Sequence, residues 1–201
     1  MTTFPAPDTF PNHTSLRRRT SRDTEGDASR VLGKLEATGQ DLTISRLVAN
    51  AGQVLRPFML MSSALLVQAT LPSSVREVVI LRIAQQQQTS YEWAEHVPMA
   101  LRAGVTQQQI DAIEAGQVDE QLFSADELLA VGIAERLLAG GGVPPEDFAA
   151  ARERWTDDGA LELVLSVGWW GGLVPVVIRA LGLVDADRDP SVGLTAPERS
   201  A

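Results

Sequence analysis

The chain has 201 residues, of which 44% are hydrophobic and 21% are charged, a composition typical of one globular domain. It contains no cysteine, which excludes disulfides, thiolate nucleophiles and cysteine-ligated zinc sites. Its formal net charge of −9 disfavours nucleic acid and anionic membranes as partners. The only histidines are His13 and His96 and the only lysine is Lys34, so a histidine-rich metal cluster is excluded as well.

Residues 1–27 predict a disordered N-terminal tail, because they are rich in Pro, Thr, Ser, Asp and Arg and have no hydrophobic period. From its charge pattern we interpret the basic cluster within this tail as solvated rather than as a nucleic-acid-binding arm. The cluster consists of Arg17, Arg18, Arg19 and Arg22. Residues 185–201 carry two prolines and alternating charges, and they predict a flexible C-terminal tail.

The pattern predicts neither an export signal nor a membrane span. Residues 20–30, which follow the arginine cluster, are polar, whereas a twin-arginine signal continues into an apolar region. The most apolar stretch, residues 163–178, contains a proline and glycines and is shorter than the roughly 20 residues that cross a bilayer. We therefore expect a cytoplasmic protein.

Residues 28–184 predict a single all-α domain, since almost every segment follows the helical period rather than strict alternation. Residues 44–69 predict one or two helices, with an interruption near Pro57. Further helix starts have the capping-box pattern, in which a Ser or Thr and a Glu or Gln three residues later satisfy free N–H groups. These patterns begin at Ser74, Thr89, Thr106 and Ser124.

The C-terminal part of the domain predicts two more helices. Pro144 and Pro145 suit the first turn of one, because proline there gives up only an N–H that is free anyway. Asp158 predicts the N-cap of the next, which leads into apolar residues 161–167. The adjacent indoles Trp169 and Trp170 that follow are interpreted either as core residues or as the wall of a pocket or subunit interface.

His96 is the strongest candidate for chemistry. It follows Glu92 by four residues, so both side chains project from one face of one helix. A carboxylate beside a partly buried imidazole can hold a proton donor near neutral pH, which suits general acid–base catalysis. The structural alternative is that Glu92 only closes its capping box and that His96 is a hydrogen-bonded core histidine.

Three runs of the sequence resemble the carboxymuconolactone decarboxylase family, which also contains the alkylhydroperoxidase D-type proteins. The runs are Arg-Glu-Val-Val-Ile-Leu-Arg at 76–82, Tyr-Glu-Trp-Ala-Glu-His at 91–96 and Ala-Leu-Arg-Ala-Gly-Val-Thr at 100–106. The resemblance extends over about residues 40–115. It implies an all-helical protomer that assembles into a homotrimer or homohexamer, with the active site near a subunit boundary.

In the hydroperoxidase branch, a glutamate, two cysteines and a histidine form a thiol relay system. The resemblance places the glutamate at Glu77 and the histidine at His96, whereas the cysteine positions fall on Thr89 and Glu92. Thiol peroxidase activity is excluded, because neither threonine nor glutamate can form a sulfenic acid and a disulfide. The chain therefore resembles the decarboxylase branch, whose chemistry needs no metal and no organic cofactor.

The resemblance implies a lyase or related proton-transfer enzyme that acts on a small carboxylated, lactone-like substrate. We expect His96 to be the proton donor, Glu92 to orient it and Glu77 to be a second relay member. Arg76 and Arg82 are candidates to bind the carboxylate, but their helical positions differ by about 240°, so at most one faces the site. The remaining candidate substrate-binding residues are Thr89, Tyr91, Trp93, Trp169 and Trp170.

Two other functions remain open at this point. The chain can be a non-catalytic helical oligomer or binding protein that has kept the fold of its relatives. It can also assist a peroxidase by borrowing thiols from a partner. Within the enzymatic hypothesis, isomerisation, dehydration and ring closure would use the same acid and base groups as decarboxylation.

Overall fold

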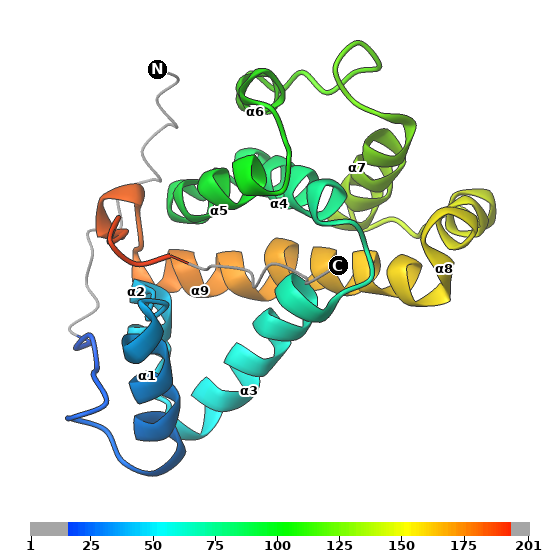
Figure 1. Cartoon of the computed structure of the whole chain (residues 1–201). Coiled ribbons are helices and arrows are strands. Elements are labelled where there is room, and N and C mark those ends of the chain that lie inside the picture. Colours follow the sequence, from blue (N-terminus) through cyan, green and yellow to red (C-terminus); the bar gives the residue numbers. More distant parts are fainter. Residues whose placement is uncertain (1–15, 194–201) are drawn as a thin grey trace.

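The computed structural model describes residues 16–193, and over that range every regular element is a helix, which confirms the predicted all-α class (Figure 1). In chain order the helices are α1 (Gly26–Thr38), α2 (Thr43–Val48), α3 (Gly52–Ser63), η1 (Ala64–Gln68), α4 (Ser73–Gln87), α5 (Ser90–Arg102), α6 (Gln107–Glu114), α7 (Ala125–Leu138), α8 (Pro145–Gly168), η2 (Trp169–Leu173), α9 (Val174–Leu181) and η3 (Asp185–Asp187). The elements η1 and η2 are π-helical and η3 is a 3₁₀ turn.

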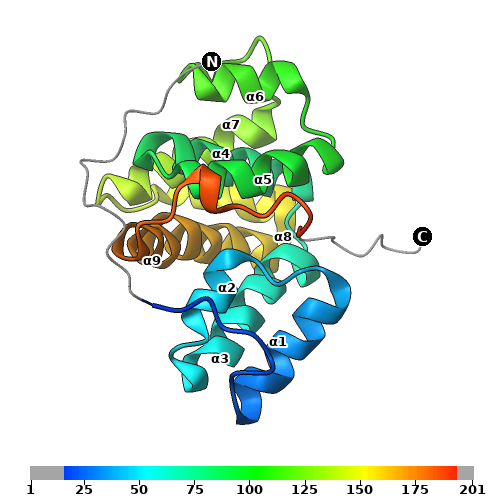
Figure 2. The same ribbon diagram turned by 90° about the vertical axis from the view of Figure 1, so that its left-hand side faces the viewer.

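Helix α4 is the centre of the larger hydrophobic core. It packs against α5, α6, α7 and α8, and most of its side chains from Val75 to Ala84 are buried. Figures 1 and 2 show that α8, η2 and α9 form one long helical run, with α4–α7 on one side of it and α1–α3 on the other. A smaller core of Ala28, Leu32, Ala49 and Leu55 joins α1 to α3. The α1–α3 group and the rest of the domain enclose a cavity between them.

Two of the four predicted capping boxes are confirmed. Thr106 and Ser124 each accept a bond from the N–H three residues on, and Gln109 and Glu127 bond back to the cap N–H. The prediction for Ser74 is wrong, because the N-cap residue of α4 is Pro72, two residues before the predicted cap. The carboxylate of Glu77, which would have completed that box, is turned into the core instead.

The helix starting at Thr89 is confirmed, but its predicted capping box is not. Thr89 is the N-cap residue of α5, and its side chain makes no capping bond to the backbone. Its hydroxyl donates to Oε2 of Glu92 at 3.2 Å. The two residues of the predicted box therefore bond to each other.

The predicted break near Pro57 lies instead at residues 49–51, between α2 and α3, and Pro57 is inside α3. The side-chain amide of Asn50 donates to the carbonyl of Leu47 near the end of α2, and the backbone N–H of Asn50 donates to the same oxygen. Asn50 also bonds to the carbonyl of Arg17, so the chain turns where this side chain bridges two segments.

Helix α8 begins at Pro145 after Pro144, as predicted. The predicted break before residues 161–167 is present, but it is at Thr156 and not at Asp158. Thr156 has φ 63° and ψ 178°, a non-helical conformation inside the helical run. The chain therefore bends two residues earlier than the cap pattern indicates.

The domain includes residues that the sequence assigned to both tails. The N–H of Ser21 donates to Glu36 at 2.8 Å, and the N–H of Arg19 donates to the carbonyl of Arg46 at 3.0 Å. Arg18 pairs with Asp187 at 2.5 Å, which joins the two segments to each other. The pattern missed this packing because it is made by polar side chains and backbone groups rather than by a hydrophobic stripe. Residues 1–15 and 194–201 of the predicted tails, with His13, lie outside the described residues.

Within the described residues, one helical run, Pro145–Leu181, is long and apolar enough to cross a membrane by length and composition alone. The apolar stretch recognised in the sequence, residues 163–178, is shorter because it counts only the most apolar residues, whereas the helical run also includes the more polar start of α8 and the end of α9. Of its most apolar window, 44% is buried inside the domain, and core helices of globular proteins have the same composition. The cytoplasmic location stays a prediction.

Candidate active site

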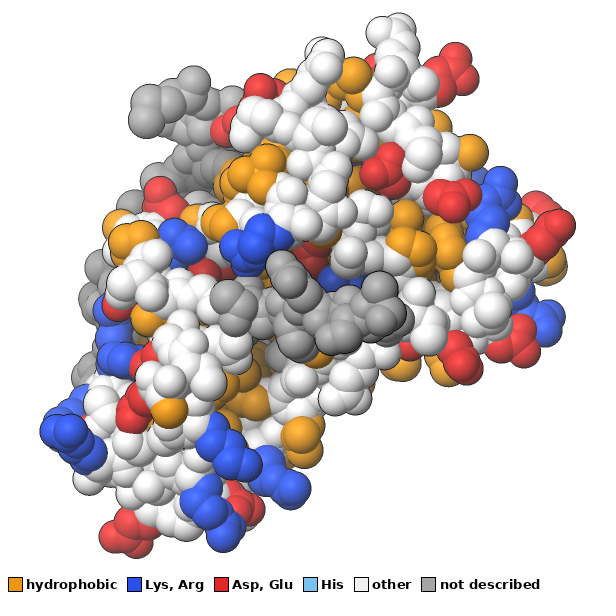
Figure 3. Space-filling view, in the orientation of Figure 1, with side chains coloured by type: hydrophobic (Ala, Val, Ile, Leu, Met, Phe, Trp, Pro, Cys, Tyr) orange, Lys and Arg blue, Asp and Glu red, His pale blue; other side chains and the backbone are white. Residues whose placement is uncertain are grey.

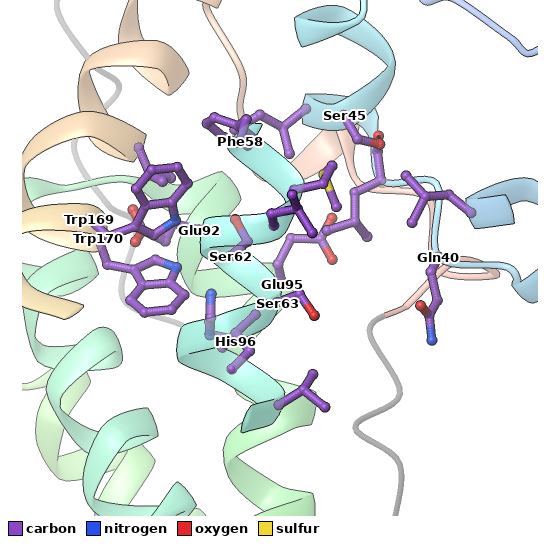
Figure 4. Close-up of a pocket in the computed structure, with 18 of the residues that line it drawn as sticks. Gln40, Ser45, Phe58, Ser62, Ser63, Glu92, Glu95, His96, Trp169 and Trp170 are labelled. Carbon is purple, nitrogen blue, oxygen red and sulfur yellow. Dashed lines mark hydrogen bonds between the residues drawn. The ribbon is translucent and has the colours of Figure 1, made fainter. Parts of the chain in front are cut away.

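A cavity of about 460 Å³ lies between α1, α3, α5 and the η2–α9 segment. This volume is within the range of sites for small organic ligands. Figure 4 shows Phe58, Ser62 and Ser63 of α3 on one side of the space, and Glu92, Trp169 and Trp170 on the other. His96 and Glu95 also line the cavity, so the predicted catalytic helix contributes directly to its wall.

Both π-helical turns contribute to the wall. Element η1 provides Leu66 and Val67, and η2 provides Trp169 and Trp170. A π turn adds a residue to the helical repeat, and such turns are frequent at functional sites. The π turn allows the two consecutive indoles to reach the same space. Core packing is the alternative interpretation of these residues from the sequence.

His96 is paired with Glu77, nineteen residues earlier. Its Nδ1 lies 2.9 Å from Oε2 of Glu77, and both side chains are at least 94% buried. The guanidinium of Arg76 lies 3.5 Å from the other oxygen, Oε1. A carboxylate can only accept, so Nδ1 carries the hydrogen and Nε2 is the ring nitrogen available to a ligand. The edge of the ring also packs on Trp170, with centroids 5.9 Å apart.

Glu92 does not orient His96, which corrects the pairing expected from the four-residue spacing. Its Oε2 accepts from Thr89, and its Oε1 is buried without a hydrogen-bond partner among the residues that the structure describes. Both residues line the cavity, but the histidine takes its carboxylate partner from α4 rather than from its own helix. Burial raises the pKa of Glu92 from 4.5 to about 8, so this carboxyl group is mostly neutral at pH 7.

Neither arginine that was expected to bind substrate lines the cavity. Arg82 pairs with Glu135 at 2.7 Å and with Gln85, which joins α4 to α7. Arg76 is 96% buried beside Glu77. The helical positions correctly predicted that the two arginines do not share a face. Neither contributes to the cavity wall, since Arg82 lies at the contact of α4 with α7 and Arg76 lies beside Glu77.

The aromatic candidates divide in the same way. Tyr91, Trp169 and Trp170 line the cavity, whereas Trp93 packs against the hydrophobic core. Thr89 does not line the cavity, and its hydroxyl donates a hydrogen bond to Glu92. The hydroxyl of Tyr91 accepts the N–H of Ile44 at 3.2 Å, which fixes α2 against α5. Burial and the nearby Glu95 raise the pKa of the Tyr91 hydroxyl above its usual value.

Sequence reasoning missed several residues of the wall. Glu95 lines the cavity and pairs with Arg188 at 3.2 Å, and burial raises the pKa of its carboxyl group. The other missed residues are contributed by the N-terminal helices and include Lys34, Ser45, Arg56, Phe58, Met59, Ser62 and Ser63. The methionine-rich run at 58–63 was a usable signal, because flexible methionines are common at adaptable binding surfaces.

Comparison with known proteins supports the helical assignment. Residues 52–136 match the model of the carboxymuconolactone decarboxylase family. A crystal structure of an uncharacterized peroxidase-related protein from Silicibacter sp. TM1040 has a similar fold, with a TM-score of 0.69 at 13% sequence identity. The similarity covers 90% of this chain and 97% of that one. No curated protein matches the chain. The matched family segment contains Glu77, Glu92 and His96, but α1 and the η2–α9 wall lie entirely outside it.

Proposed function

Since residues 52–136 match the carboxymuconolactone decarboxylase family, we propose that the chain is a cofactor-free lyase or related proton-transfer enzyme. The proposed substrate is a small carboxylated, lactone-like molecule. The observation that carries the proposal is the buried contact of 2.9 Å between Nδ1 of His96 and Oε2 of Glu77, on the wall of a cavity that also contains Glu92.

The three side chains supply a base, an acid and a means of orientation. Glu77 holds the imidazole by Nδ1, so Nε2 gives or takes the proton. Glu92 has a pKa of about 8 and can donate a hydrogen bond from its neutral form to a carbonyl or lactone oxygen. This division of roles exchanges the two glutamates relative to the sequence-based assignment.

In a decarboxylation, the bond between the carboxylate carbon and the adjacent ring carbon breaks and carbon dioxide leaves. The electron pair moves through the conjugated system onto the carbonyl oxygen, where Glu92 stabilises the developing charge. The proton on Nε2 of His96 is then delivered to carbon, which leaves a neutral imidazole that is reprotonated from solvent. Isomerisation would use the same groups with Nε2 acting first as the base.

The proposal is tested by following carbon dioxide release and isomerisation with a series of small carboxylated lactones. We expect His96→Gln and Glu77→Gln to lower kcat at least about 100-fold, the usual contribution of a positioned acid–base group. Glu153→Gln, an exposed residue of α8, is the matched control and should keep full activity. Full activity of His96→Gln in a folded protein would refute the assignment.

A non-catalytic binding protein is the second candidate, and the largely apolar wall of the cavity favours it. The two candidates differ in turnover. A binding protein would retain ligand after His96→Gln and would show no substrate consumption in the wild type.

We also propose that the chain assembles into a homotrimer or homohexamer. The support is a group of exposed apolar side chains along α8, η2 and α9. It consists of Leu161, Leu165, Leu173 and Val176, each at least 41% exposed. Exposed apolar surfaces of this kind are common at subunit contacts.

A further inference from the structure

Acidic and basic side chains occupy different sides of the cavity. Helix α5 supplies the two carboxyl groups, Glu92 and Glu95, which are both buried. Helices α1 and α3 supply Lys34 and Arg56, which are both exposed. We call Lys34 and Arg56 the basic rim. Figure 3 shows basic side chains gathered over the α1–α3 part of this face, next to apolar ones.

The space between these sides is apolar. Its wall includes Leu42, Phe58, Met59, Leu66 and Ile178. Phe58 packs on Trp169 with ring centroids 4.9 Å apart, so an aromatic surface covers one end. A ligand that fills this volume gains free energy by removing its own apolar surface from water, and a compact, doubly charged molecule cannot do so.

Two polar atoms of the cavity residues have no partner within residues 16–193. They are Oε1 of Glu92 and Nε1 of Trp169, which are buried without a hydrogen bond although both residues line the space. Leaving buried polar groups unpaired costs free energy, so an oxygen-bearing ligand that reaches them is favoured. The indole N–H donates, and the neutral carboxyl group of Glu92 can donate or accept.

The basic rim is suited to the charged end of the same ligand. Among residues 16–193, neither Lys34 nor Arg56 forms an ion pair with an acidic side chain. A carboxylate at this exposed side of the cavity would lie near cationic side chains and remain partly hydrated. A second carboxylate deeper inside would be desolvated next to Glu92 and Glu95, which is unfavourable.

We propose that the cavity binds amphipathic monocarboxylic acids, with the apolar body inside and the carboxylate at the basic rim. This inference rests on the proposed function only in taking the cavity as the substrate site, and it narrows the substrate class. It places the reacting carbonyl or lactone oxygen of a substrate at Glu92 and His96, and its only carboxylate at Lys34 and Arg56. Among the proton-transfer reactions of the proposed function, it therefore favours isomerisation over decarboxylation.

Three ligands of equal chain length test the charge arrangement: decanoic acid, 1-decanol and decanedioic acid. Binding is measured at pH 7 and low salt by tryptophan fluorescence and calorimetry. We expect decanoate to bind more tightly than either of the other two. The double variant Lys34→Gln/Arg56→Gln should lower decanoate affinity about tenfold and leave decanol affinity unchanged. Arg136→Gln on α7, outside the cavity wall, is the matched control and should change neither.

Three results would overturn the inference: no decanoate binding, decanoate affinity unchanged in the double variant, or decanedioate binding as tightly as decanoate. Glu77→Gln separates this inference from the proposed function, since it should abolish turnover and keep decanoate affinity. If the wild type has no turnover but its decanoate affinity depends on the rim, the catalytic proposal alone fails. If turnover requires His96 but decanoate affinity is unchanged in the double variant of the basic rim, only the proposed ligand class is refuted.

Discussion

Glu92 shows how one buried side chain can set both stability and chemistry. It lies in an apolar wall with one oxygen held by Thr89 and the other unpaired among the described residues, so its charged form is costly. A neutral carboxyl group next to a histidine is what acid–base chemistry on an uncharged carbonyl requires. The cost of this arrangement should be measurable without any substrate.

We expect the free energy of unfolding to fall as pH rises from about 4.5 to about 8. The pKa of Glu92 is about 8 in the folded protein and 4.5 when the side chain is fully solvated, as in the unfolded chain, so in this window the folded state binds more protons. The stabilisation is complete below pH 4.5 and lost as pH passes 8. At about 1.4 kcal/mol per pKa unit, the loss is on the order of 5 kcal/mol.

Urea unfolding of the wild type and of Glu92→Gln between pH 5 and 8 measures this difference. The glutamine variant lacks the titrating group and should have a flatter profile. Glu153→Gln, which changes an exposed glutamate of α8, should follow the wild type. Parallel profiles for the wild type and Glu92→Gln would show that the carboxyl group is ionised throughout this range.

At the scale of the helix, the sequence correctly predicted the features that residues close together in the chain determine. The capping boxes at Thr106 and Ser124 are local, and both are present. The same pattern at Ser74 failed because Glu77 pairs with His96 on another helix, a contact that no local pattern contains. The spacing of Glu92 and His96 led to a wrong pairing for the same reason. It indicates a partner on the same helix, whereas His96 pairs with Glu77 on α4.

The cavity was only half predictable for a related reason. The motif residues on α5 were found, because they carry ionisable groups among apolar ones. Lys34 and Phe58 line the wall only because α1 and α3 lie across the cavity from α5 and α9, an arrangement that the sequence of α1 and α3 does not indicate. The π turn that brings Trp169 and Trp170 to the same space is likewise a property of the packed helix.

The break at Thr156 gives a prediction about the α8 helix. A threonine with φ 63° and ψ 178° occupies a region that glycine adopts readily, and such strain costs on the order of 1–3 kcal/mol. The side chain is exposed, so its removal costs little packing. We expect Thr156→Gly to be more stable than the wild type by roughly 1 kcal/mol, after the larger entropy of glycine in the unfolded chain is allowed for.

Chemical denaturation of Thr156→Gly and Thr156→Ala provides the comparison. Alanine removes the same hydroxyl and methyl groups but keeps a Cβ atom, and so it cannot relieve the strain. Equal stability of the two variants would show that the backbone at residue 156 is not strained in solution.

At the scale of the whole molecule, the run α8–η2–α9 has two functions in the proposed assembly. It lines the cavity with Trp169, Trp170 and Val174, and it also exposes Leu165 and Val176 to solvent. A row of exposed apolar side chains is unfavourable in water, and contact with a second copy would remove it.

We expect Leu165→Glu/Val176→Glu to dissociate the assembly. Light scattering after gel filtration should give three or six times 21.6 kDa for the wild type and a lower mass for the double variant. Leu101→Glu, an equally exposed leucine on α5, is the control and should leave the mass unchanged. A monomeric wild type, or an unchanged mass for the double variant, would contradict the proposed interface.

A helix shared by a cavity and a subunit contact makes the two equilibria interdependent. Any adjustment of Trp169 or Trp170 around a bound molecule is passed along the same backbone to Leu173 and Val176, which would meet the neighbouring copy. By thermodynamic reciprocity, ligand binding would then shift the monomer–oligomer equilibrium by the same free energy by which oligomerisation changes the ligand affinity. Saturation curves recorded at low and high protein concentration would not superimpose, and their separation would report the coupling free energy.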